Sequence, residues 1–116
     1  MSLVVDPDRA RFPSSGGQCQ LAIVNGGEER LAVKVKCSDN ALYRVRPVYS
    51  IVEPMSALGL EVSRQSGLPK EDRLILQYVA IDAEHADPAS PFQPGSASAG
   101  PIKEIKVGLV GAAAEE

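Results

Sequence analysis

The sequence predicts an all-β fold in which two antiparallel sheets pack face to face, as in an immunoglobulin domain. Glycine and proline occur 10 and 9 times and divide the chain at short intervals. Between them lie short runs in which apolar and polar residues alternate with a period of two, the pattern of half-buried strands. Such runs number about seven or eight, which suits a sandwich of this kind. No stretch sustains a helical period over three turns, so no long helix is expected.

Length and composition indicate one small globular domain. The chain has 116 residues, 44% hydrophobic and 23% charged, close to the average of folded proteins. We place the domain at residues 1–110 and assign residues 111–116 to a short acidic tail. A formal net charge of −3 argues against bulk binding to nucleic acid or anionic membranes. The sequence has neither a signal peptide nor an apolar run of the roughly 18 residues that a membrane helix needs.

The first half of the chain gives the clearest strands. Residues 18–24 alternate and are followed by Asn-Gly-Gly at 25–27, a strong hairpin signal because these residue types tolerate positive φ. Residues 31–37 alternate again, with Lys34 and Lys36 on the solvent face. Further short strands are expected at Leu3–Val5, Tyr43–Pro47, Tyr49–Val52 and Ala57–Ser63.

Two of these strands are expected at sheet edges. Pro47 cannot donate a ladder hydrogen bond, so residues 43–47 end at or lie on an edge. Residues 49–52 carry no charge, which leaves an edge unguarded against strand addition. In residues 73–81, by contrast, the positions beyond Ile75 that would face either side of a strand are both apolar. This is typical of a central strand covered on both faces.

The segment 82–101 contains four prolines and no periodicity, so we expect a long mobile loop before a last strand at 102–110. The only histidine, His85, lies in this loop beside Glu84 and Asp87. A loop holds a general base poorly, and a solvated histidine is the favoured interpretation.

The sequence contains few residues in patterns that are typical of catalytic or metal-binding sites. Cys19 and Cys37 lack metal-ligand spacing, and no phosphate-binding glycine motif is present. The two cysteines are interpreted as free thiols in a reducing cytosol; the alternative is an inter-sheet disulfide, which implies secretion. The carboxylates are scattered, and no pair stands out. We therefore expect no enzyme activity, no cofactor and no metal site.

The one group of residues that suggests a binding site is a set of basic side chains. Two alternating segments each place a pair of cations on their solvent faces, and a further arginine begins the long apolar strand. If the segments are neighbours, the cations converge on a patch suited to an acidic peptide or a phosphate. The alternative is a solvated face with scattered counter-ions such as Glu61. The cations are Lys34 and Lys36, Arg44 and Arg46, and Arg73.

Several motifs together resemble the major sperm protein (MSP) domain, and the linked block 34–54 is the most specific. The resemblance implies a seven-stranded immunoglobulin-like β-sandwich, with cis prolines at Pro7 and Pro47. It runs over almost the whole chain. The motifs are Leu3–Pro7 followed by Arg11-Phe12, Leu21–Asn25, Leu31–Cys37, Tyr43–Pro47 and Ile51–Pro54.

Two functions follow from the resemblance. Free-standing MSP domains of nematode sperm are cytoplasmic structural proteins that dimerise and polymerise to drive crawling. The VAMP-associated branch grips acidic FFAT peptides and carries a coiled coil and a membrane anchor after the domain. This sequence ends at Glu116 without either, so it looks more like the sperm type.

The family's peptide-binding positions can be transferred one by one. Its paired lysines match Lys34 and Lys36, and the two threonines that follow fall on Cys37 and Ser38. Its later lysine-phenylalanine-methionine falls on Arg73, Leu74 and Ile75.

The sequence therefore predicts a non-enzymatic cytoplasmic sperm protein, related to the MSP motility system. It is expected to act by protein–protein contact or self-association, including a homodimer. The alternative is an adaptor that binds acidic FFAT-like peptides through a basic sheet face. Nucleic acid and an integral membrane segment are not expected.

Overall fold

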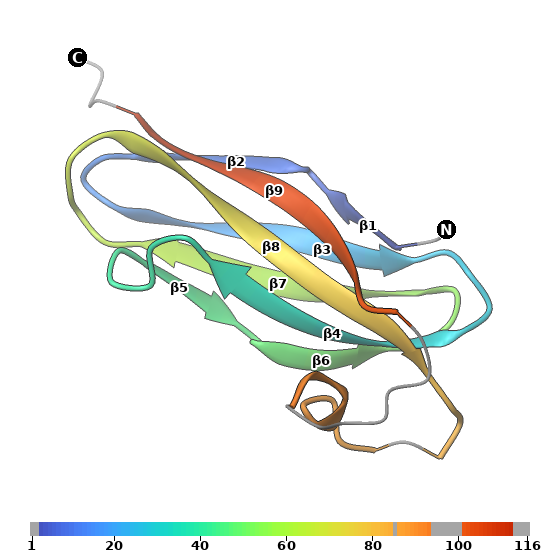
Figure 1. The fold of residues 1–116 in the computed structure, drawn as a ribbon. Helices are drawn as coiled ribbons and strands as arrows, with labels where there is room; N and C mark the ends of the chain where they lie inside the picture. The colour runs from blue at the N-terminus through green and yellow to red at the C-terminus, as the bar shows by residue number, and fades with distance from the viewer. Residues whose placement is uncertain (1–2, 85, 94–100, 113–116) are drawn as a thin grey trace.

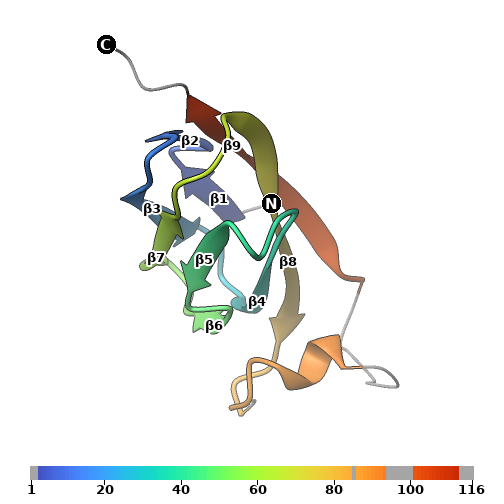
Figure 2. The same ribbon diagram turned by 90° about the vertical axis from the view of Figure 1, so that its left-hand side faces the viewer.

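The computed structural model describes residues 3–84, 86–93 and 101–112, and these form nine strands and one 3-10 helix arranged as two layers (Figures 1 and 2). The four-stranded sheet has the order β1 (Leu3–Asp6), β3 (Gly17–Asn25), β7 (Ser56–Arg64), β5 (Tyr43–Arg46). The five-stranded sheet has the order β2 (Arg9–Pro13), β9 (Lys103–Ala112), β8 (Lys70–Ile81), β4 (Arg30–Cys37), β6 (Tyr49–Val52). The 3-10 helix η1 covers Ser90–Phe92. Within those residues, the structure contains no helix with the length and apolar character that crossing a bilayer requires.

The chain changes sheet at two prolines. Strands β1 and β2 flank Pro7, strands β5 and β6 flank Pro47, and the peptide bonds that precede both prolines are cis. If each pair is counted as one bent strand, the nine strands become the seven of the expected immunoglobulin-like sandwich. The structure departs from the predicted antiparallel sheets in one strand pair. Strand β2 pairs with β9 in parallel, whereas all the other pairs among the described residues are antiparallel.

The core lies between the sheets and follows the period of two. Inward side chains of both sheets are almost fully buried, among them Leu21 and Ile23 on β3 and Leu74 and Leu76 on β8. The rings of Phe12 and Tyr43 meet edge to face with centroids 5.5 Å apart. Because burying a Leu or Ile side chain contributes about 1.5–3 kcal/mol, this apolar centre is the main source of stability.

The turn at residues 25–27 differs from the prediction of a hairpin. Strand β3 belongs to the four-stranded sheet and β4 to the other, so the turn carries the chain between layers. The Asn25 side chain is buried and donates to the carbonyls of Glu29 (2.7 Å) and Val52 (3.1 Å). Among the described glycines only Gly16 has a positive φ, so the turn does not use the backbone freedom of its glycines. A polar side chain fixes it instead.

The loop 82–101 is more ordered than expected over the part that the structure describes. Figures 1 and 2 place the segment that contains η1 near β6 and the end of β8. Pro91 is buried, and the Phe92 ring lies 6.3 Å from that of Tyr49 on β6. Ala32 and Val79, which are paired in register and point outward from the sheet, are also buried. His85 and residues 94–100 lie outside the described residues.

The last strand also extends further than expected. Strand β9 runs through Gly111 and Ala112, two positions that the sequence assigned to the acidic tail. The rest of that tail lies outside the described residues. The expected central strand is β8, which lies between β9 and β4 as predicted.

Candidate partner-binding face

The outer face of the five-stranded sheet gathers most of the predicted binding residues. Lys34 and Lys36 project from β4, and Arg73 and Ile75 project from β8 on the same side. In register, Lys36 lies opposite Ile75, and Ile75 lies opposite Lys106 of β9. The alternation of β4 and β8 therefore places these side chains on one surface, because only one parity of each strand faces the core.

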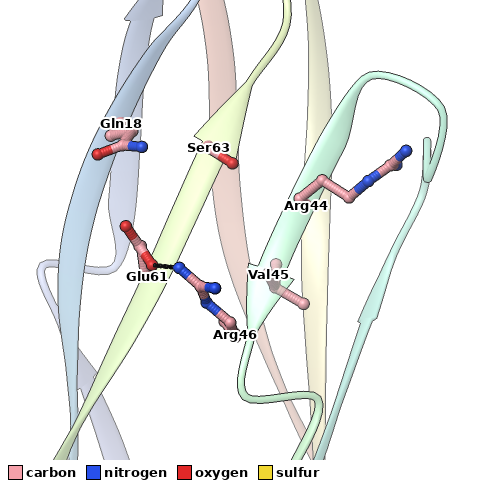
Figure 3. Close-up of a pocket in the computed structure, with 6 residues that line it drawn as sticks. All are labelled: Gln18, Arg44, Val45, Arg46, Glu61 and Ser63. Carbon is pink, nitrogen blue, oxygen red and sulfur yellow. Dashed lines mark hydrogen bonds and ion pairs between the residues drawn. The ribbon is translucent and has the colours of Figure 1, made fainter.

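Arg44 and Arg46 do not join this surface, so the condition for a patch of all five cations, that the two basic segments are neighbours, is not met. Strand β5 pairs with β7 in the four-stranded sheet, because the chain changes layers between β5 and β6. Both arginines instead border a groove of about 320 Å³ on that sheet (Figure 3). There Arg46 forms an ion pair with Glu61 (2.6 Å), and Arg44 donates to the carbonyl of Asn40 (2.5 Å). Glu61 is thus the counter-ion that the sequence alternative named.

We call the outer face of the five-stranded sheet the basic outer face, since it carries Arg9, Arg11, Lys34, Lys36, Arg73 and Lys106. Three of these cations were missed by sequence reasoning. Arg9 and Arg11 of β2 lie opposite Gly108 and Val110 of β9, and Lys106 lies two residues from Gly108 on the same face. The alternation of Arg9-Ala10-Arg11-Phe12 is a signal that could have shown that both arginines face away from the core. The parallel pairing of β2 with β9, which brings them to this sheet, carried no local signal.

Apart from Lys34, the cations of this face form no hydrogen bond or ion pair to any described residue, whereas most other cations do. Within the described part of the chain, Arg30 and Arg46 pair with carboxylates, Lys70 bridges two of them, and Arg44 and Arg64 donate to carbonyls. Lys103, at the start of β9, has no partner there either. The exposed cations of the outer face without a hydrogen bond or ion pair to any described residue are Arg9, Arg11, Lys36, Arg73 and Lys106.

Acidic side chains on the same face are few. Glu104 accepts a hydrogen bond from Gln77 Nε2 (2.9 Å), and Glu71 lies opposite Val110 at the far end. The five unpartnered cations therefore create a local positive potential on a chain whose net charge is negative.

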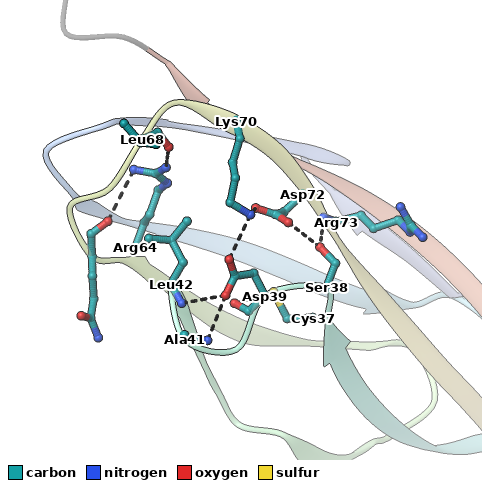
Figure 4. A network of polar contacts seen from close by, with 11 residues as sticks. Cys37, Ser38, Asp39, Ala41, Leu42, Arg64, Leu68, Lys70, Asp72 and Arg73 are labelled. Carbon is teal, nitrogen blue, oxygen red and sulfur yellow. Dashed lines mark hydrogen bonds and ion pairs between the residues drawn. The ribbon is translucent and has the colours of Figure 1, made fainter.

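Ser38 is held by a polar network at one end of the face (Figure 4). Its hydroxyl donates to Asp72 Oδ1 (2.8 Å) and accepts from the backbone N–H of Arg73 (3.0 Å). Lys70 Nζ bridges Asp39 (2.9 Å) and Asp72 (2.6 Å). The hydrogen bond from Lys70 lowers the pKa of Asp39, and the two carboxylates raise the pKa of Lys70. An anionic ligand therefore meets carboxylates at this end, so the free cations further along are better placed to bind it.

An aromatic pair marks the other end. The Lys34 ammonium lies 5.8 Å from the centre of the Tyr49 ring, and Phe92 packs on Tyr49. Phe92 lies within the segment 82–101, which the sequence predicted to be a loop. Its contact with Tyr49 depends on the loop folding back over the sheet, which no periodicity revealed.

The remaining candidate groups offer no reaction centre among the described residues. Cys19 and Cys37 are free, and burial raises the pKa of the Cys37 thiol, which disfavours the nucleophilic thiolate. No three His, Cys, Asp or Glu side chains are grouped to hold a metal ion in residues 3–84, 86–93 and 101–112. The geometry instead offers an exposed cationic surface, whose chemistry is the binding of anionic groups.

Comparisons with known proteins agree with the fold. A family model described as the MSP (major sperm protein) domain matches residues 2–100. The chain is 46% identical over 92 residues to sperm-specific class P protein 31 of Caenorhabditis elegans, covering 79% of this chain and 86% of the relative. It is 42% identical to class P protein 34 of the same organism, with the same coverage.

Solved structures give the same result. An MSP family member of Caenorhabditis elegans superimposes with a TM-score of 0.86 at 40% identity, covering 96% of this chain and 98% of that one. A second MSP-domain protein of that organism gives 0.84 at 30% identity, covering 94% and 98%. The YadV chaperone, at 11% identity and a TM-score of 0.69, covers 95% of this chain and 51% of its own, and shares the fold alone.

Proposed function

Because the chain belongs to the major sperm protein domain family, we propose that it is a cytoplasmic protein of nematode sperm that binds acidic segments of other proteins through the basic outer face. The observation that carries this proposal is the gathering, on one face of one sheet, of exposed cations that have no partner among the described residues. Its place is expected to be within the MSP motility system, in a binding role without catalysis.

Several contacts must act together for such binding. An exposed ion pair contributes only about 0.2–1 kcal/mol, so a partner has to engage several of Lys36, Arg73 and Lys106 at once. Charges in water are screened within about 8 Å at physiological ionic strength. The affinity should therefore fall steeply as salt is added. Ile75, between Lys36 and Lys106, provides an apolar contact in the middle of the cations.

A titration with a short acidic FFAT-like peptide, rich in glutamate and containing two aromatic residues, tests this function. We expect amide shifts at residues 34–38 and 73–75 in NMR spectra and loss of binding in Lys36→Glu and Arg73→Glu. The matched control is Arg44→Glu, which makes the same charge change on the other sheet. The proposal is wrong if no amide of the basic outer face shifts, or if the control variant loses binding equally.

Self-association through β6 is a second candidate. Strand β6 is the edge strand beside β4, and its sequence Tyr49-Ser50-Ile51-Val52 carries no charge. Tyr49 within this strand and Val48 just before it are 37% and 42% exposed. An unprotected edge of this kind can add a strand from a second copy.

Sedimentation at rising concentration tests the second candidate. We expect a dimer that forms in the wild type and is lost in Ile51→Lys, which places a charge on the edge strand. A strict monomer at millimolar concentration, or association that Ile51→Lys leaves unchanged, contradicts it.

A further inference from the structure

The outer face of the four-stranded sheet has an exposed apolar end. Its side chains stand in four rows that follow the register of the strands, and we call this surface the four-stranded outer face. The first row is Val4, Val24 and Ala57, and the second is Asp6, Ala22 and Gly59. Val4 is 55% exposed, and Met55, just before β7 at the same end, is 74% exposed. Apart from Asp6 these two rows carry no charge and no side chain larger than valine, so a second sheet can pack on them at the usual spacing of about 10 Å.

The other end of this face is polar and carries its cations on β5. The third row is Gln20, Glu61 and Arg46, and the fourth is Gln18, Ser63 and Arg44. Arg46 pairs with Glu61 beside the groove that Figure 3 shows, so two arginines and one glutamate leave an excess of one positive charge there. Asp6, exposed on β1 at the opposite edge of the sheet, forms no hydrogen bond or ion pair through its side chain to any described residue. One edge of the face is therefore acidic and the other basic.

These charges match those of a second copy that is related by a two-fold axis along the strands. When two such faces meet about this axis, β1 lies opposite β5 of the second copy and β3 lies opposite its β7, because the order of the strands is reversed. A two-fold rotation does not shift the rows along its axis, so the apolar rows of one copy face those of the other. Asp6 then lies at the level of Gly59, one repeat of about 7 Å from the row of Arg46. An arginine side chain spans that distance.

Other ways of pairing two copies bring like charges together. A two-fold axis across the strands would place β5 on β5, with the arginines of both copies at the same edge. Contact through the basic outer face would place cations that have no partner among the described residues against each other. The axis along the strands joins apolar rows and opposite charges at once.

The size of the face sets the strength that we expect. Four strands and four rows of side chains cover about 20 Å by 20 Å, or about 400 Å² on each copy. A total of about 800 Å² is small for a specific interface and suits weak, transient association. The dimer should therefore form only at sub-millimolar concentration and above.

We propose that a second copy of this chain docks on the four-stranded outer face about a two-fold axis along the strands, with Asp6 of each copy paired with Arg46 of the other. The interface is distinct from strand addition at β6, since it uses the face of the other sheet and not an edge. Because the four-stranded sheets meet in its centre, the dimer carries the two basic outer faces on its outer surfaces. One dimer can then bind two acidic segments, a step that rests on the proposed function, whereas the dimer itself does not.

Charge reversal tests the pairing directly. Asp6→Arg and Arg46→Asp each bring like charges together twice in a dimer. Each variant alone should therefore associate about tenfold more weakly than the wild type in sedimentation equilibrium. An equimolar mixture of the two variants restores both pairs with reversed sign and should associate about as tightly as the wild type. This rescue also shows that both variants are folded.

A second pair of variants tests the apolar rows. Ala57→Lys points an ammonium at the second copy, so the affinity should fall at least about tenfold. Ala41→Lys makes the same change at an exposed alanine of the turn before β5 and should leave association unchanged. In NMR spectra of the wild type, dilution should shift the amides of residues 4, 24, 57 and 59.

Three results would overturn the proposal. These are a strict monomer at millimolar concentration, a mixture of the charge variants that associates no more tightly than either alone, and equal effects of Ala57→Lys and Ala41→Lys. Association that is lost in Ile51→Lys and kept in Ala57→Lys would assign the dimer to β6 and overturn it too. None of these results bears on the acidic peptide, which should bind Ala57→Lys as tightly as the wild type.

Discussion

Gly111 on β9 and the buried Arg64 on β7 offer the sharpest test of how this sandwich is closed. The guanidinium of Arg64, only 3% exposed, donates to the carbonyls of Ser14 (3.0 Å) and Leu68 (2.6 Å). It also lies 5.8 Å from the centre of the Tyr43 ring. Because carbonyl oxygens from two separate loops hold it, the group has little freedom to move aside.

The perturbation is Gly111→Ala. The new Cβ would lie 2.6 Å from Arg64 Cζ and Nη2 and 2.7 Å from Nε, well inside van der Waals contact. Relief requires the guanidinium to leave one of its carbonyl partners. A hydrogen bond from a charged group contributes about 1.5–3 kcal/mol, and overpacking strain costs about 1–3 kcal/mol. We therefore expect Gly111→Ala to lower the free energy of unfolding by about 3 kcal/mol, within the range of these two costs.

Urea denaturation measures this loss, read as a lower midpoint at an unchanged m-value. The matched control is Gly59→Ala on β7, where the added Cβ meets only Gln20 Oε1 at 3.6 Å. In a strand interior that change should be neutral or stabilise by about 0.5–1 kcal/mol. The double variant Arg64→Met with Gly111→Ala should lose less than the sum of the single variants, since the shorter side chain makes room. If Gly111→Ala is as mild as Gly59→Ala, the reasoning is refuted.

Three further predictions concern the polar network, the loop and a thiol. Because the pKa of Asp39 is lowered in the folded state, its pairing with Lys70 stabilises the fold above the unfolded carboxyl pKa of about 4. This stabilisation is lost as the pH falls through the folded-state pKa of Asp39. The urea midpoints of wild type and Lys70→Met should therefore converge in acid, and a difference that stays constant with pH would contradict this. Phe92→Ser should uncover Tyr49 and speed hydrogen exchange at residues 32 and 79, with unchanged exchange as the contrary result. Cys37, whose pKa burial raises, should react with iodoacetamide more slowly than free cysteine at about pH 8; an equal rate would disprove it.

Local pattern was enough to predict every strand except β2, and the side of the clearest strands that faces solvent. The alternation at residues 31–37 placed Lys34 and Lys36 correctly outward, and the apolar run at 73–81 identified the central strand. Both results depend on nearest-neighbour periodicity, which the two-residue repeat of a strand fixes. The prediction of a strand covered on both faces holds only near its end, where Val79 is buried, since on the same face Arg73 is exposed and Ile75 is half-buried.

Sheet membership, by contrast, is not a local property. Residues 43–46 look the same in sequence whether they pair with β4 or with β7, so the cations of β5 were assigned to the wrong surface. Arg9 reaches the basic outer face only through the parallel pairing of β2 with β9 at the other end of the chain. The turn at 25–27 was misassigned for the same reason, since a glycine pair signals a tight turn and not the layer that the chain enters.

Cross-linking with a lysine-reactive reagent in native sperm extract, followed by mass spectrometry, tests the central claim most directly. Binding through the outer face of the five-stranded sheet requires that cross-links to partner proteins concentrate at Lys36 and Lys106. Lys103, at the far end of β9, and Lys70, which is held between two carboxylates at the start of β8, serve as internal references on the same sheet. Partner cross-links found mainly at these two reference lysines would contradict the account.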